Sequence, residues 1–469
     1  MRNPVPAIAI VACICAASVA AEPTTSETPI SYFKDVLPIF RQKNCTGCHQ
    51  PAKQGGDYVM TDFAALLKGG ESGEAAVVPG HPEKSYLLGQ ITPADGKASM
   101  PKDAPPLSSP ELAKIRTWIE QGAKDDTPAS NRPQYDADHP PIYLALPVLK
   151  SVEYSPTGDL LAVSGYHEVL LHRADGSGLV ARLVGQSERI ESARFSPDGK
   201  FLAVCGGSPG RFGELQLWDV EQRKLQLSIM IGYDTIYGCS WAPSGKLVAV
   251  GCPDNTLRGF DPQSGKQVLF SGAHNDWVLD TTFSVNSDHL ISVSRDMSMK
   301  LIEVKTERFI DNITSITPGA LKGGLITVDR HPTKDELLCG GADGAPKVFQ
   351  MLRTSARKIG DNANLLREFE AMPGRVYSAT FNHDGSRIAA GSSSDGQGEV
   401  RVYNAADGAV IWKASISAGG IYSVDFSPDG ATVAAAGFDG DVRLYSATDG
   451  HLLKQFTPVN ITTMAAAGG

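Results

Sequence analysis

A repeated pattern fills about two thirds of this 469-residue chain and constrains its fold more than any other feature. Each repeat has a β-rich run that ends in one large residue, then a turn, then further β-rich runs separated by Gly or Asp turns. The run-ending residues are Tyr154, Phe195, Trp241, Phe283, Arg330, Phe381 and Phe426, and successive gaps are 41, 46, 42, 47, 51 and 45 residues. A period of this size is typical of four-stranded propeller blades. Seven repeats therefore predict an all-β, seven-bladed propeller over residues 149–458.

The turns within the repeats have a clear physical basis. Ser196-Pro197-Asp198-Gly199 and Ser427-Pro428-Asp429-Gly430 place proline where φ is pre-set and glycine where φ must be positive. Such a turn is expected to close the hairpin between the first and second strands of a blade. The connections between the second and third strands look enlarged at residues 206–213 and 392–398, so we expect two long loops on the working face of the ring.

One short motif before the repeats predicts a chemical function. Cys45-Thr46-Gly47-Cys48-His49 reads C-x-x-C-H, the attachment signature of a c-type haem. The sulfurs of Cys45 and Cys48 can form thioethers with the porphyrin, and His49 then serves as the proximal iron ligand. A zinc site would need a second ligand pair at suitable spacing, and a redox-active dithiol would need a βαβ context. Spacing alone also allows a structural disulfide.

A second iron ligand is expected downstream. Met100, in Ser99-Met100-Pro101, offers a soft, neutral thioether that would raise the reduction potential. Met60 and His81 are the competitors, with core filling and helix capping as their alternative roles. On spacing alone, Met100 is favoured.

Short helices surround the motif. Apolar spacing predicts helices over residues 32–43 and 63–68, the second capped by Thr61-Asp62. A third helix is expected from Pro82. A fourth follows the capping box of Ser108 and Glu111 and runs to about Gln121. The region is therefore predicted to be all-α.

The N-terminus has the composition of an export signal. Arg2 precedes a short apolar run, and Ser18-Val19-Ala20-Ala21 supplies small residues for cleavage after Ala20 or Ala21. We expect a periplasmic or otherwise exported protein without a membrane span in the mature chain. Ile10-Val11-Ala12-Cys13 also loosely fits a lipoprotein box.

These features divide the chain as follows. The predicted parts are a signal peptide (1–21), a flexible lead-in (22–31), a cytochrome c domain (32–122), a linker (123–148), the propeller (149–458) and a tail (459–469). Residues 143–148 could add a strand that clasps the ring. Four of the remaining cysteines, Cys205, Cys239, Cys252 and Cys339, lie in apolar runs and are expected to be buried thiols.

Two resemblances sharpen these expectations. The helical region resembles the planctomycete-type cytochrome c domain in the following segments, which occur in the family's order: 35–40, the C-x-x-C-H motif, 67–73, 78–85, Met100-Pro101 and 118–122. That resemblance implies one covalent haem c with His49 and Met100 as axial ligands. His81 and Lys102 depart from the family's usual acidic residue and Met-Pro-Pro run.

The repeats resemble the WD-repeat family, although only Trp218-Asp219 shows the eponymous pair and His274 alone approximates the Gly-His element. A WD-type hydrogen-bond network is therefore not expected in every blade. The fusion of the two parts also looks like a known planctomycete architecture.

The function expected from the sequence is one-electron transfer by an exported mono-haem c-type cytochrome, whose propeller docks a redox protein partner. The alternative is a propeller scaffold for protein or polysaccharide in which the haem is a redox sensor or accessory. A net charge of −9 argues against nucleic acid as partner. We find no zincin, nucleophile-elbow or phosphate-loop motif and expect no enzymatic activity.

Overall fold

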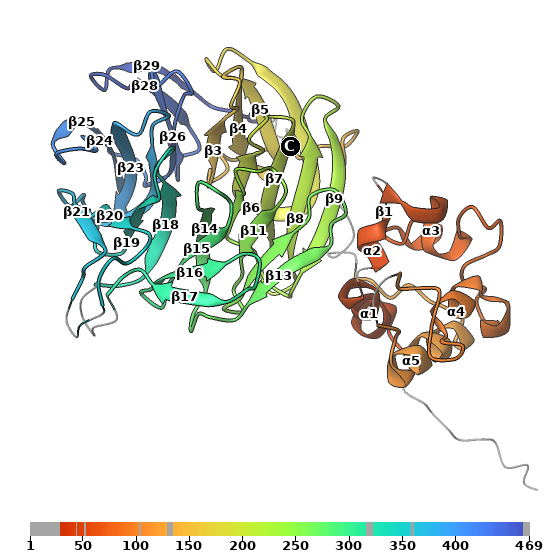
Figure 1. Cartoon of the computed structure of the whole chain (residues 1–469). Helices are drawn as coiled ribbons and strands as arrows, with labels where there is room; N and C mark the ends of the chain where they lie inside the picture. Colours follow the sequence, from red (N-terminus) through yellow and green to blue (C-terminus); the bar gives the residue numbers. More distant parts are fainter. Residues whose placement is uncertain are drawn as a thin grey trace, which may run out of the picture.

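The computed structural model contains a small helical module beside a ring of β-sheets (Figure 1). It describes residues 29–43, 45–50, 53–102, 105–128, 135–315, 322–356, 358 and 361–462. The predicted signal peptide lies outside these residues. Within the described ranges, which begin at residue 29, none of the helices is both long and apolar enough to cross a membrane.

The helical module is built from short elements around one apolar core. They are η1 (Tyr32–Val36), α1 (Leu37–Gln42), α2 (Cys45–Cys48), β1 (His49–Gln50), β2 (Lys53–Gln54), η2 (Gly55–Asp57), α3 (Phe63–Lys68), η3 (Pro82–Lys84), α4 (Tyr86–Ile91) and α5 (Ser109–Glu120). The predicted cap of α3 is confirmed, because the Asp62 carboxylate accepts a hydrogen bond of 2.8 Å from the N–H of Ala65. The predicted helix over 32–43 is divided into η1 and α1, with Pro38 in the first turn of α1. Phe40, Ile115 and Trp118 form the centre of the core.

The ring has seven blades of four antiparallel strands, as predicted. Blade 1 comprises β3 (Val152–Tyr154), β4 (Leu160–Ser164), β5 (Tyr166–Arg173) and the first half of β6 (Leu179–Phe195), and blade 2 comprises the second half of β6 with β7 (Phe201–Ser208), β8 (Phe212–Asp219) and β9 (Lys224–Ile231). Blade 3 comprises β10 (Gly238–Trp241), β11 (Val248–Gly251), β12 (Leu257–Phe260) and β13 (Gln267–Ser271), and blade 4 comprises β14 (Val278–Phe283), β15 (His289–Ser294), β16 (Met299–Glu303) and β17 (Phe309–Asn312).

The last three blades follow the same order. Blade 5 comprises β18 (Leu325–Arg330), β19 (Glu336–Gly341), β20 (Lys347–Gln350) and β21 (Leu365–Glu368), and blade 6 comprises β22 (Arg375–Phe381), β23 (Arg387–Ser394), β24 (Gln397–Asn404) and β25 (Val410–Ile416). Blade 7 comprises β26 (Ile421–Phe426), β27 (Thr432–Gly437), β28 (Val442–Ser446) and β29 (Leu452–Phe456). Each inner strand ends at the residue that the repeat pattern singled out, including Arg330.

One expectation about the blades was wrong. Residues 206–213 and 392–398 are not enlarged loops, because most of them belong to long strands. In blade 2, β7 and β8 pair through Ser208 and Phe212, and in blade 6 only Asp395 and Gly396 separate β23 from β24. The extra residues therefore lengthen two hairpins.

The ring closes without exchanging a strand between its ends. All four strands of blade 7 come from the end of the chain, and β3 packs beside β26. The expected clasp takes the form of single contacts: Tyr143 makes a parallel bridge with Ile461, and the N–H of Leu149 donates to the carbonyl of Gly437 at 2.9 Å. The end of the predicted linker is thus fixed to the propeller.

The inner strands satisfy their free edges with side chains from the neighbouring blade. An inner strand has a strand partner on one side only, so N–H groups on its other side need acceptors. Hydroxyl and carboxylate groups supply them: Ser423 accepts from Val152 N (3.0 Å), Ser151 from Ala193 N (3.1 Å), Ser378 from Val424 N (3.2 Å), Asp280 from Val328 N (3.0 Å), Asp425 from Tyr154 N (2.8 Å), Asp329 from Phe381 N (2.8 Å) and Glu153 from Phe195 N (3.3 Å). Each bond joins one blade to the next.

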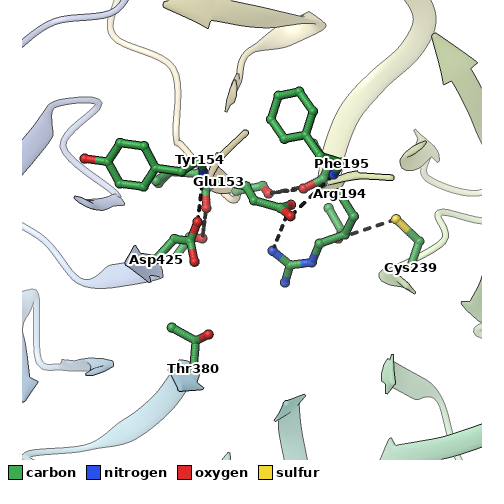
Figure 2. A network of polar contacts seen from close by, with 12 residues as sticks. Glu153, Tyr154, Arg194, Phe195, Cys239, Thr380 and Asp425 are labelled. Atoms are coloured by element: carbon green, nitrogen blue, oxygen red, sulfur yellow. Dashed lines mark hydrogen bonds and ion pairs between the residues drawn. The ribbon is translucent and has the colours of Figure 1, made fainter. Parts of the chain in front are cut away.

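These acceptors place several carboxylates inside the ring. Figure 2 shows Glu153 facing Arg194, and Asp425 beside Tyr154. Arg194 and Glu153 form an ion pair of 3.4 Å. Burial raises the pKa of Glu153 and of Asp425, and it raises the pKa of Asp280 to about 6, while the nearby Arg194 opposes each of these increases. The folded ring therefore holds protons that isolated carboxyl groups would release.

We expect the buried Asp280 carboxyl to contribute a loss of stability as the pH rises from about 4 to about 6, opposite in sign to the contribution of the ring's histidines whose pKa is lowered by burial. An unfolded Asp titrates near pH 3.9, so in this window Asp280 holds a proton in the folded state that it has released in the unfolded state, and its contribution to the free energy of unfolding decreases. Asp280→Asn mimics the protonated carboxyl and should remove roughly 2 kcal/mol of this decrease, measured by urea unfolding at several pH values. Glu153 and Asp425 remain titratable in this variant and should cause the rest of the pH-dependent decrease in the free energy of unfolding. Asp407→Asn, in an exposed turn, is the control and should leave the pH dependence unchanged; an equal effect of both variants would contradict the argument.

Candidate functional site

The predicted attachment motif forms one compact turn. Cys45–Cys48 is the single helical turn α2, and His49 begins β1 immediately after it. Both cysteines are half-buried free thiols, while Thr46 and Gly47 between them are buried. Burial raises the pKa of the Cys45 thiol to about 12. Because both sulfurs are free and only half-buried, they could form the thioether bonds that the motif predicts.

His49 has the state that an iron ligand needs. Burial lowers the pKa of its imidazole, so the ring is neutral at pH 7 and keeps a lone pair on one nitrogen. In the described part of the chain, its Nδ1 atom is buried without a hydrogen-bond partner. The ring lies 5.2 Å from that of Tyr58, whose hydroxyl donates to the carbonyl of Leu66 at 2.8 Å. A buried histidine with an unused nitrogen fits a residue that takes another partner when a cofactor is bound.

Glycines let the surrounding loops approach the motif closely. A side chain at Gly55 would come within 3.3 Å of the Cys48 carbonyl and 3.5 Å of the His49 ring. At Gly70, within one of the segments that resemble the cytochrome family, a Cβ atom would lie 2.1 Å from the carbonyl of Gly56. Gly70 therefore needs glycine for packing, whereas a side chain at Gly55 would require only a small shift of its neighbours.

The three candidates for the second iron ligand lie in different environments. Met60 is only 2% exposed and belongs to the helical core, and its N–H donates to the His49 carbonyl at 2.7 Å. His81 is exposed and pairs with Glu83 at 3.2 Å, and it makes no capping bond to the helix that follows. Met100 is half-buried and packs against the same core as Cys45. Core filling thus accounts for Met60, and the role of Met100 as iron ligand stays a prediction.

The residues of the helical module fit a covalently held porphyrin. A zinc site would need further ligands, and within the described residues no group of three or more His, Cys, Asp or Glu side chains is arranged to hold a metal ion. A c-type haem needs two thiols, one neutral histidine and one further ligand. Cys45, Cys48, His49 and Met100 would hold it.

Sequence reasoning missed three residues around the motif. Gln50 is 2% exposed and its amide donates to the Gly47 carbonyl at 3.0 Å. Tyr58 packs on the His49 ring, and Arg41 of α1 lies half-buried near the propeller. Only the adjacency of Gln50 to the motif could have singled it out, because its partner in the propeller is 178 residues away in the sequence.

The propeller uses its polar side chains for structure. His274 contacts Asp296 at 2.9 Å and Ser292 at 2.8 Å, which is a WD-type network in blade 4. Other blades use different pairs, as predicted from the degenerate repeats. The cysteines at 205, 239, 252 and 339 are buried free thiols, also as predicted.

Comparison with known proteins identifies both parts. Residues 45–104 match the family model "Planctomycete cytochrome C". Residues 152–237 match the model "Anaphase-promoting complex subunit 4 WD40 domain", and residues 225–261, 265–303, 363–404 and 411–446 match "WD domain, G-beta repeat". The chain therefore joins a cytochrome c-like domain to a WD-repeat propeller, as expected.

Curated relatives show more distant similarity. The eukaryotic translation initiation factor 3 subunit I of Neosartorya fischeri is 25% identical over 312 residues, which cover 63% of this chain and 78% of the relative. The same subunit from Candida glabrata is 22% identical over 55% of this chain and 65% of its own length, and that from Coccidioides immitis is 27% identical over 51% and 69%. The matched families and these relatives are named for a cytochrome, a repeat and assembly subunits, which agrees with the expectation that the chain is not an enzyme.

Substitution of the three candidate ligands should separate their roles. In protein produced with haem maturation enzymes, Met100→Ala should change the ligand-sensitive absorption of the haem and lower its reduction potential, because a thioether ligand raises that potential. Met60→Ala should instead destabilise the helical module by about 2–5 kcal/mol through lost packing, without that spectral change.

His81→Ala is the surface control and should change neither the haem absorption nor the stability of the helical module. A ligand-type spectral change in Met60→Ala, with Met100→Ala resembling the unsubstituted protein, would reverse the assignment.

Proposed function

We propose that this chain is a propeller scaffold that binds a protein partner and carries one haem c as a one-electron accessory. The observation that supports the scaffold is the closed ring itself. Its channel-lining carboxylates and hydroxyls bond to neighbouring strands and so are committed to holding the ring together. Propellers of this kind present loops and strand edges to partners, and the relatives are named as subunits of a larger factor.

The haem part of the proposal is supported by the attachment motif and its geometry. A bound haem with two protein ligands supplies one-electron transfer. Cys45 and Cys48 on α2 would hold the porphyrin covalently, and neutral His49 would face the iron from one side. Met100, packed at the edge of the helical core, would be the second ligand. A redox protein partner docked on the propeller would then exchange electrons with this centre.

We also propose that the protein is exported. The support is the N-terminal pattern of a positive residue, an apolar run and small residues before Glu22. N-terminal sequencing of the protein from its own cells should begin at Ala21 or Glu22, whereas a start at Cys13 would indicate a lipoprotein.

The two parts of the function can be tested separately. Protein made with haem maturation enzymes should show a c-type absorption band on reduction, and Cys45→Ala with Cys48→Ala should abolish it. If the propeller alone is the scaffold, partner proteins from an extract of the producing organism should bind the unsubstituted protein and the haem-free double variant equally.

Three other results would change the proposal. A colourless unsubstituted protein would remove the haem. Partners lost together with the haem would make electron transfer the main function instead. Retention of polysaccharide in place of protein would change the class of partner.

A further inference from the structure

The helical module contacts blade 2 through one buried glutamine. The Gln50 side chain accepts a hydrogen bond of 2.9 Å from the N–H of Ser228 on β9, and its amide donates to the carbonyl of Gly47 at 3.0 Å. The helical turn α2 lies against β9, the outermost strand of blade 2 (Figure 1). Gln50 thus links the turn that carries the cysteines directly to the free edge of the propeller blade.

A chain of buried polar groups continues behind Ser228. The Glu214 carboxylate accepts hydrogen bonds from the hydroxyls of Ser228 and Ser187, both at 2.5 Å, and from the amide of Gln216 at 2.7 Å. Gln216 in turn accepts from the indole N–H of Trp218 at 2.8 Å. Glu214 is only 1% exposed. A buried carboxylate is therefore the centre of the polar network beneath the docked module.

Blade 2 departs from its neighbours at the position of Gln216. In blades 3 to 7 the equivalent residue of the third strand is a cation, which pairs with an acid of its own blade: Arg258 with Asp254, Lys300 with Asp296, Lys347 with Asp343, Arg401 with Glu399 and Arg443 with Asp439. In blade 1, Glu168 pairs with Arg182 at 2.6 Å. Blade 2 has a neutral amide where five other blades carry the positive charge.

Blade 6 is the closest comparison. Its Glu399 occupies the position of Glu214, two residues before Arg401, and the two side chains approach to 2.7 Å. Because a buried carboxylate is costly without a cation, Glu214 should need one from elsewhere. Burial lowers the pKa of Arg41 on α1, and the attraction of Tyr32 and Glu214 counteracts that effect, although Arg41 and Glu214 form no ion pair within 4 Å in the described structure.

We propose that blade 2 is a docking site built for the helical module, in which Gln50 is the positioning residue that holds the haem-binding turn against Ser228 of β9. The strand edge offers a free N–H with the buried Glu214 carboxylate behind it, and it suits a segment that brings a side-chain amide. The dock fixes the turn that carries Cys45 and Cys48 relative to the ring. That consequence for a haem rests on the proposed function, whereas the docking itself does not.

Hydrogen exchange of the β9 amides tests the role of Gln50. The Ser228 N–H lies on a strand edge and is protected by the Gln50 side chain, so Gln50→Ala in the full chain should speed exchange in β9 by about tenfold. Gln222→Ala, in the exposed turn before β9, is the matched control and should leave the rate unchanged. Equal exchange in the Gln50 variant and the unsubstituted protein would overturn the proposal.

The charge on Glu214 gives a second test with the same readout. Arg41→Met should also speed exchange in β9. Gln216→Arg restores the cation that blade 6 has, so in that background Arg41→Met should have a much smaller effect. Glu399→Gln, which removes the corresponding carboxylate of blade 6, is the control and should leave exchange in β9 unchanged. If Arg41→Met is silent, or if Gln216→Arg leaves its effect intact, Arg41 is not the partner of Glu214.

Measuring exchange with and without haem separates the two proposals. If the protein is colourless and its β9 amides still respond to Gln50→Ala, the haem proposal is wrong and the docking proposal is supported. If the protein has a c-type spectrum and its β9 amides do not respond, the docking proposal is wrong and the haem proposal is supported. A change in reduction potential on Gln50→Ala would show that the dock acts on the haem itself.

Discussion

The propeller depends on how the free edges of its inner strands are satisfied. Each of these strands has a partner on one side only, and a buried N–H without an acceptor costs about 1–3 kcal/mol. The acceptors are side chains of the preceding blade, so the bond that satisfies an edge also joins two blades. Asp425 does this for Tyr154 between the last blade and the first, where no exchanged strand closes the ring. The cost is a set of crowded carboxylates, which Arg194 and retained protons offset.

Local signals were sufficient to predict the number of blades and their phase. The residue that ends an inner strand is large, and the turn after it contains proline or glycine in every blade but the fourth, so both are visible in the sequence without knowledge of the fold. The attachment motif is likewise local, because all five residues of C-x-x-C-H lie in α2 and the first residue of β1. The cap of α3 at Asp62 followed from the same kind of short-range rule. Features set within a few residues were therefore predictable.

Several glycines of the propeller serve packing rather than turning, and these positions were predicted wrongly as loops. Residues 206–213 look like a loop because glycines recur there, but a side chain at Gly206 would meet the Arg189 carbonyl at 1.9 Å and one at Gly213 would meet the Asp234 carbonyl at 2.3 Å. Glycine at these positions lets the backbone of a neighbouring segment approach the strand closely. The contact of Gln50 with Ser228 could not be predicted for a different reason, since it joins residues 178 positions apart and depends on how two domains meet.

The lengthened strands and the missing cation of blade 2 belong to one arrangement. In blades with short strands, such as blade 5, the acid lies in the turn between the second and third strands, where Asp343 retains 19% side-chain exposure. Lengthening β7 and β8 moves the acid into the strand and buries it, so Glu214 and Glu399 both need compensation. Blade 6 supplies Arg401 from within, whereas blade 2 places Gln216 there and has its outer strand in contact with α2. Under the proposed dock, the helical module completes the polar edge of blade 2, so experiments on either part should use the full chain.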